Sequence, residues 1–200
     1  MEKLLDYLNG RHFEVNTLEG AIKAMNHFLA CMPDRLANTE RVVSNLRELL
    51  KNYTPENLSK EDMLKVAMLH NIGYSHDLFF SSFHPYDGGI YLKENGWNRE
   101  IYNLVMAHSF ARELVVTEAK ELFPYIMLAE RSCSINDLAI LALADFTAGP
   151  KGELLTLQER VDGIHTRYGA DSTIGKHATL VRRTLGVFSL TARIIHKGRS

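Results

Sequence analysis

Apolar residues recur at helical spacing along most of this chain. Between residues 18 and 32 they fall three and four positions apart, which places them on one face of a helix. The members of this face are Leu18, Ala21, Ile22, Met25, Phe28, Leu29 and Met32. The sequence holds no sustained alternation of apolar and polar residues of the kind that indicates strands. The pattern therefore predicts an all-α fold.

Polar caps and helix breakers divide this pattern into segments. Ser59-x-x-Asp62 is typical of a helix start, whereas Pro33 and Gly149-Pro150 are typical of places where a helix cannot continue. Asp34 is expected to cap the helix that follows Pro33. The expected helices cover residues 2–9, 18–32, 35–51, 59–71, 85–94, 98–109, 111–122, 124–131, 134–145, 156–168 and 172–196. Residues 72–84 form a loop that is longer than most helix connections.

The segments predict a single domain. Residues 1–33 form an N-terminal helical extension packed on the core, 34–150 form the core, and 151–200 add C-terminal helices of the same domain. There is no internal repeat and no linker long enough to separate domains.

Composition excludes several classes of protein. A net charge of −1 gives no overall field that would attract nucleic acid or an acidic membrane. No apolar run approaches the ~18 residues of a membrane span. The two cysteines have no metal-type spacing, and the first four residues do not resemble a signal peptide. We therefore expect a cytoplasmic protein with no nucleic-acid or membrane partner, and leave open a homo-oligomer.

One stretch, residues 64–74, carries the strongest chemical signal. It is an almost fully apolar run, typical of a buried helix, that ends in the pair His70-Asn71, and Gly73 then turns the chain. Other polar residues also lie at the ends of apolar helices or beside them, namely His84, His108 and Asp145. A helical bundle could bring these side chains to one rim, where they would either bind a ligand or serve as structural hydrogen-bonding groups.

Imidazole and carboxylate groups together are ligands that suit Mn, Fe, Co, Ni or Zn. A divalent ion on His70, Asp145, His84 and His108 would activate water and neutralise phosphate charge.

The chain resembles the HD-domain superfamily of metal-dependent phosphohydrolases, including small bacterial HD proteins. Five segments carry the resemblance in the order that the family has them, over about residues 34–150. They are Arg35–Val43 (the early helix), Leu64–Tyr74 (the His-Asp helix), Phe83–Leu92 (the second histidine region), Leu104–Ser109 (the third) and Leu143–Pro150 (the late Asp motif). The resemblance implies an HD-domain helical bundle whose metal site uses His70, Asp145, His84 and His108.

Two departures from the family pattern weaken that expected metal site. Asn38 stands where the family has its first histidine, and Asn71 stands where it has the aspartate of the His-Asp pair. An amide oxygen is a neutral and weaker ligand for a transition metal. We therefore expect one metal ion at most.

Two functions follow from the resemblance. The first is a metal-dependent phosphohydrolase-like protein, a phosphomonoesterase or phosphodiesterase, that acts on a nucleotide or another small phosphate ester. In it His70 and Asp145 hold the metal, and His84 and His108 position phosphate or share the metal. The alternative is a catalytically inactive HD domain that binds a phosphorylated ligand or acts by regulation and interaction.

Overall fold

The computed structural model describes residues 13–197, and for residues 188–197 only the backbone. The helix expected over residues 2–9 lies outside this part. The described chain contains helices and one isolated bridge between Ala148 and Leu154, but no strand. This confirms the all-α prediction and the single domain. No helix within residues 13–197 is both long enough and apolar enough to cross a membrane.

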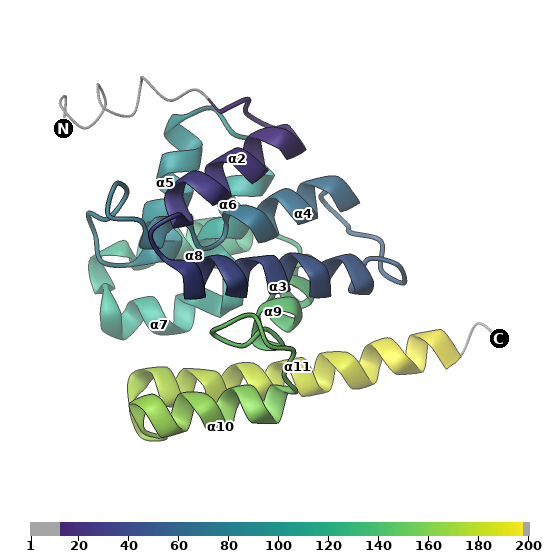
Figure 1. Cartoon of the computed structure of the whole chain (residues 1–200). Coiled ribbons are helices and arrows are strands. Elements are labelled where there is room, and N and C mark those ends of the chain that lie inside the picture. The colour runs from purple at the N-terminus through teal and green to yellow at the C-terminus, as the bar shows by residue number, and fades with distance from the viewer. Residues whose placement is uncertain (1–12, 198–200) are drawn as a thin grey trace.

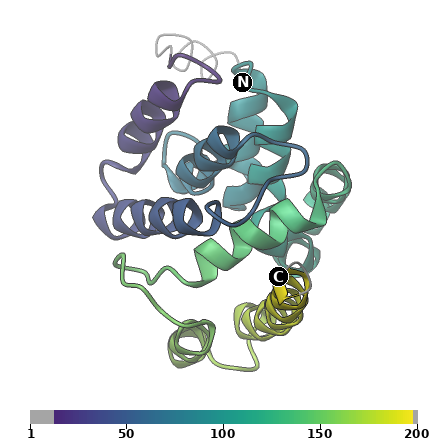
Figure 2. The same ribbon diagram turned by 90° about the vertical axis from the view of Figure 1, so that its right-hand side faces the viewer.

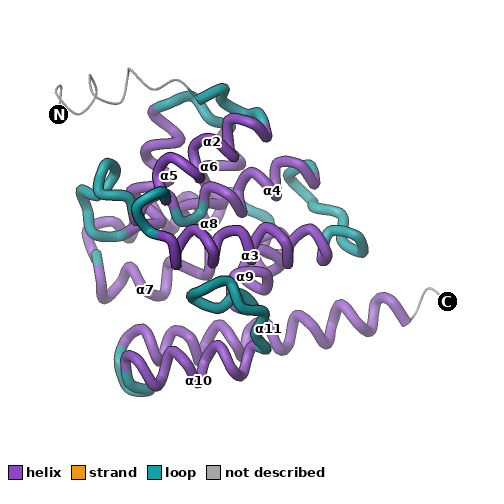
Figure 3. The backbone as a smooth tube through the Cα atoms, in the orientation of Figure 1, coloured by secondary structure: helices purple, strands orange, loops and turns teal. Residues whose placement is uncertain are grey.

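The helices form one layered body with a C-terminal hairpin along one side (Figures 1 and 3). The body consists of α2 (Leu18–Leu29), α3 (Pro33–Leu49), α4 (Lys60–Leu69), α5 (His84–Glu94), α6 (Arg99–Ala107), α7 (Ala111–Glu118), α8 (Phe123–Arg131) and α9 (Ile135–Phe146). The hairpin consists of α10 (Leu157–Tyr168) and α11 (Thr173–Lys197). Short 3-10 turns, η1 (Ile72–Tyr74), η2 (His108–Phe110) and η3 (Lys120–Leu122), join some of the helices.

Helix α4 forms where the apolar run predicted it. Ser59 and Asp62 make a reciprocal capping box at its start, as the sequence indicated. Met63, Val66 and Leu69 are completely buried. Lys65 is buried as well: its ammonium group donates to Asn16 O at 2.7 Å and lies 3.0 Å from the Asp62 carboxylate. The side chain is tolerated in the core because its charge is paired and hydrogen-bonded.

The start of α3 differs from the prediction. Asp34 lies inside the helix, whose N-cap is Met32 and makes no side-chain hydrogen bond. Pro33 occupies the first helical position, where its missing N–H and fixed φ are harmless. The helix therefore begins two residues earlier than expected.

Helix α9 connects the body to the hairpin. One of its sides contributes Leu138, Leu141 and Ala144 to the main core, which α2, α3, α4 and α6 also build. Its other side, including Ala142 and Phe146, packs against buried residues of α10 and α11. Figure 2 shows α10 and α11 below the body, with α9 above them. A helix that is apolar on both sides belongs between two packed layers.

Candidate functional site

The structure brings together the side chains that the sequence singled out at helix ends. His70 is the C-cap residue of α4, His84 is the first residue of α5, and His108 is the C-cap residue of α6. Asp145 comes from the last turn of α9. We call these four residues the His–Asp cluster.

The rings of the cluster are in contact. The ring centroid of His108 lies 5.1 Å from that of His70 and 5.1 Å from that of His84. The Nε2 atoms of His84 and His108 are 3.2 Å apart, within hydrogen-bond distance. His70 Nε2 lies 3.9 Å from Asp145 Oδ1.

Backbone carbonyls fix two of the imidazoles. His70 Nδ1 donates to Ala67 O at 2.7 Å, and His108 Nδ1 donates to Val105 O at 2.6 Å. In a neutral imidazole a proton on Nδ1 leaves Nε2 as an acceptor or metal ligand. His108 Nε2 therefore accepts from His84. His70 Nε2 is buried and has no hydrogen-bond partner.

Burial keeps these imidazoles neutral. Desolvation lowers the pKa of His108 to about 4, with the nearby His70 adding to the shift. Desolvation and the neighbouring His108 hold the pKa of His84 well below its usual range. Burial also lowers the pKa of His70, although the Asp145 charge opposes this. Neutral imidazole is the form that binds metals.

Asp145 stays ionised within the cluster. Burial is the largest single effect and would raise its pKa, but the combined effects of His70, Arg160, His108 and the Ser109 hydrogen bond outweigh it, so the pKa is lowered. Ser109 Oγ donates to Asp145 Oδ2 at 2.5 Å. A carboxylate that is charged and oriented in this way can serve as a metal ligand.

The turn that carries Ser109 is held from the C-terminal hairpin. Ser109 and Phe110 both have positive φ, 52° and 57°, an uncommon conformation for residues other than glycine. His177 of α11 donates from Nε2 to Ser109 O at 2.9 Å. The hairpin therefore supports the loop that orients Asp145.

Asn38 and Asn71, the two residues that depart from the family pattern, are hydrogen-bonded to each other. Asn71 donates from Nδ2 to Asn38 Oδ1 at 3.1 Å and to Thr39 Oγ1 at 3.1 Å. Asn38 Nδ2 in turn donates to Ala148 O and Gly149 O, at 3.3 and 3.0 Å. The amides thus join α3, the end of α4 and the loop after α9.

A close backbone approach places His84 beside the end of α4. A Cβ added to Gly73 would lie 2.1 Å from His84 O and 2.6 Å from Gly88 N, so only glycine fits between η1 and α5. The ring of Tyr74 consequently stacks on that of His84, with centroids 3.8 Å apart and planes at 17°.

Two arginines next to the cluster were not identified as site residues from the sequence. The Arg35 guanidinium lies 3.9 Å from the centre of the Tyr74 ring. Arg160 of α10 has a buried Nε with no hydrogen-bond partner, and lies close enough to Asp145 and Tyr74 for their charges to affect its pKa. Arg35 sits three residues before Asn38, a spacing that could have indicated a shared face. No signal in the sequence links Arg160 to the site, because its position depends on how the hairpin packs.

Some features of the cluster fit a metal ion and others do not. Metal ligands about 2.1 Å from one ion lie roughly 3 to 3.5 Å apart, so His70 Nε2 and Asp145 Oδ1 are slightly wider than such a pair. The unpartnered, buried His70 Nε2 opposite an ionised carboxylate fits a cation. Among the side chains that the structure describes, no set of three or more His, Cys, Asp or Glu residues is already arranged to hold a metal.

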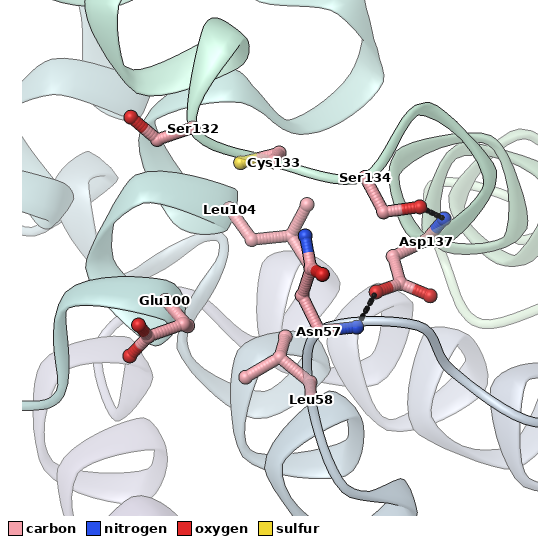
Figure 4. Close-up of a pocket in the computed structure, with 8 residues that line it drawn as sticks. All are labelled: Asn57, Leu58, Glu100, Leu104, Ser132, Cys133, Ser134 and Asp137. Atoms are coloured by element: carbon pink, nitrogen blue, oxygen red, sulfur yellow. Dashed lines mark hydrogen bonds between the residues drawn. The ribbon is translucent and has the colours of Figure 1, made fainter.

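A small pocket lies elsewhere, between the loop before α4, the α6 helix and the start of α9 (Figure 4). None of its lining residues belongs to the His–Asp cluster. One of its charged lining residues, Asp137, accepts hydrogen bonds from Tyr53 Oη and from the backbone N–H groups of Glu56 and Asn57. Asp137 therefore has a structural role in tying the 53–57 loop to α9.

Comparisons of the chain with protein-family models, curated proteins and solved structures find no match.

Proposed function

We propose that this protein is an HD-type, metal-dependent phosphohydrolase-like protein whose substrate is a nucleotide or another small phosphate ester. The observation that carries the proposal is the buried, unpartnered His70 Nε2, which faces the ionised Asp145 carboxylate. His70 and Asp145 would hold one divalent ion of Mn, Fe, Co, Ni or Zn. When bound, such an ion supplies an activated water and neutralises phosphate charge.

The side chains of the cluster have distinct roles in this proposal. The Ala67 carbonyl keeps the His70 ring oriented with Nε2 toward Asp145, and Ser109 orients the Asp145 carboxylate. His84 and His108 remain neutral at pH 7. In the proposed complex the His84 Nε2–H would leave His108 Nε2 and donate to a phosphate oxygen. Together they would bind and orient the ester.

Metal content tests this proposal. The protein, purified without chelator and supplied with excess Mn, is expected to hold one equivalent of metal and to hydrolyse a generic phosphate ester. His70→Ala should lose both properties, because it removes the ligand atom opposite Asp145. His76→Ala is the matched control, since His76 is an exposed loop residue outside the cluster. Metal-free protein with no hydrolysis in excess Mn would contradict the proposal.

The amide pair favours a second candidate, a catalytically inactive HD domain that binds a phosphorylated ligand. Asn38 and Asn71 direct their amide groups to each other and to backbone carbonyls. On this reading Asn38→His combined with Asn71→Asp should create metal binding that the parent lacks. Equal metal affinity of the parent and the double variant would eliminate the inactive-domain candidate.

A further inference from the structure

Arg35, Tyr74 and His84 form a column beside the cluster. The guanidinium lies over one face of the Tyr74 ring, 3.9 Å from its centre, and His84 stacks on Tyr74 at 3.8 Å. A guanidinium that stacks through its face keeps its N–H donors free along its edge. The column thus places one cation beside the imidazoles, close enough to contribute to the lowered pKa of His70, His84 and His108.

Arg160 supplies a second cation at the same place. Its Nε is buried without a hydrogen-bond partner, which leaves a donor with unmet capacity. Burial lowers its pKa, and the charged groups that act on it include Asp145, Arg35 and Tyr74. The residue reaches this point from α10, outside the segments that resemble HD domains.

Within the part of the chain that the structure describes, neither arginine forms a salt bridge with an acidic residue. Among the described residues, no carboxylate lies within 4 Å of Arg35 or Arg160, whereas Arg112 and Lys65 each contact two. Asp145 is already engaged by Ser109 and lies near His70. Two cations therefore face one carboxylate and three neutral imidazoles, which leaves a net positive charge.

We propose that Arg35 and Arg160 form an anion-binding pair for a terminal phosphate group, so that the ligand of the cluster is a phosphate monoester and not a diester. A terminal phosphate carries about −1.5 to −2 charges at pH 7, and a diester carries a single charge. Paired guanidinium groups bind the more highly charged group better because each can donate to separate oxygens. This inference rests on the proposed function and decides between its two ester classes.

Binding of two simple anions to the full-length protein tests the inference. Inorganic phosphate and dimethyl phosphate are titrated into chelator-treated protein at pH 7.5 by isothermal calorimetry. We expect phosphate to bind about tenfold or more tightly than dimethyl phosphate, since charge-assisted hydrogen bonds contribute most to such binding. Equal affinities, or no binding of phosphate, would overturn the inference without any variant.

Substitutions locate the binding. Arg35→Gln and Arg160→Gln should each weaken phosphate binding about tenfold or more, because each removes a cation. Arg47→Gln, on the same helix as Arg35 but exposed, is the matched control and should bind as the parent does. Circular dichroism checks that each variant folds, and Arg160→Lys retains the charge if Arg160→Gln does not fold. Parent-like affinity in both Gln variants would overturn the inference.

The assay is independent of catalysis. A protein that shows no hydrolysis but binds phosphate through both arginines would contradict the phosphohydrolase proposal alone. If the protein is a metal-dependent hydrolase but its phosphate affinity does not change when either arginine is replaced, only this inference is contradicted.

Discussion

In the His–Asp cluster, burial determines the protonation state of the three histidines more than charge pairing does. Desolvation is the leading cause of the lowered pKa of each of the three histidines. The result is a group of neutral imidazoles next to an ionised Asp145, held in place by backbone carbonyls and by Ser109. Such a group provides neutral ligand nitrogens and an ionised carboxylate at pH 7.

Acid should destabilise the protein through these histidines. The pKa of His108 is about 4 in the folded chain, below the value of about 6.5 for an unfolded histidine. Between these values the unfolded state binds the extra proton, so stability present above pH 6.5 is lost as the pH falls toward 4. We expect the urea midpoint to fall over this range, and to fall less in His108→Gln. An identical pH slope in the two proteins would contradict this explanation.

Elements position the cluster through their ends and their closest contacts. The end of α4 carries His70, and η1 and the start of α5 meet at Gly73 and His84. Because the backbones touch there, the position of His84 depends on the absence of one side chain.

Gly73→Ala should therefore destabilise the fold. Its Cβ would lie 2.1 Å from a backbone oxygen that cannot easily move, and overpacking of this kind costs about 1–3 kcal/mol. Gly163→Ala in α10 is the matched control: no atom lies within 4 Å of its Cβ, so the change should stabilise the helix by up to about 1 kcal/mol. Urea denaturation measures both. A Gly73→Ala protein as stable as the parent would show that η1 and α5 are not in tight contact.

Some of these features could be predicted from the sequence and others could not. Ser59 was correctly placed as a cap because its partner residue Asp62 is local. Asp34 was placed wrongly because Pro33 can itself begin a helix. The buried Lys65 and the placement of Arg160 depend on contacts between distant segments, which residue spacing along one helix does not encode. The HD resemblance and the metal remain predictions.

At the scale of the whole molecule, α9 joins the body and the hairpin, and we expect the two to unfold as one cooperative unit. Its two sides belong to different clusters of buried residues, and His177 of the hairpin supports the loop that orients Asp145. Loss of packing in the hairpin should therefore also destabilise the body.

Leu185→Ala tests this coupling. Leu185 is fully buried between α11 and α9, and its truncation should cost about 2–5 kcal/mol. The single tryptophan, Trp97, lies in the main core and reports on the body. We expect its fluorescence transition to shift together with the helical circular-dichroism signal. Leu180→Ala, at an exposed position of the same helix, should change little. An unshifted Trp97 transition in Leu185→Ala would mean that the hairpin unfolds separately.

The most direct test of the account is a crystal structure grown with Mn²⁺ and inorganic phosphate, with anomalous scattering to locate the metal. The account predicts phosphate in contact with Arg35 and Arg160 and an anomalous peak between His70 Nε2 and the Asp145 carboxylate. Phosphate and metal found elsewhere on the protein, with the cluster contacting neither, would contradict it.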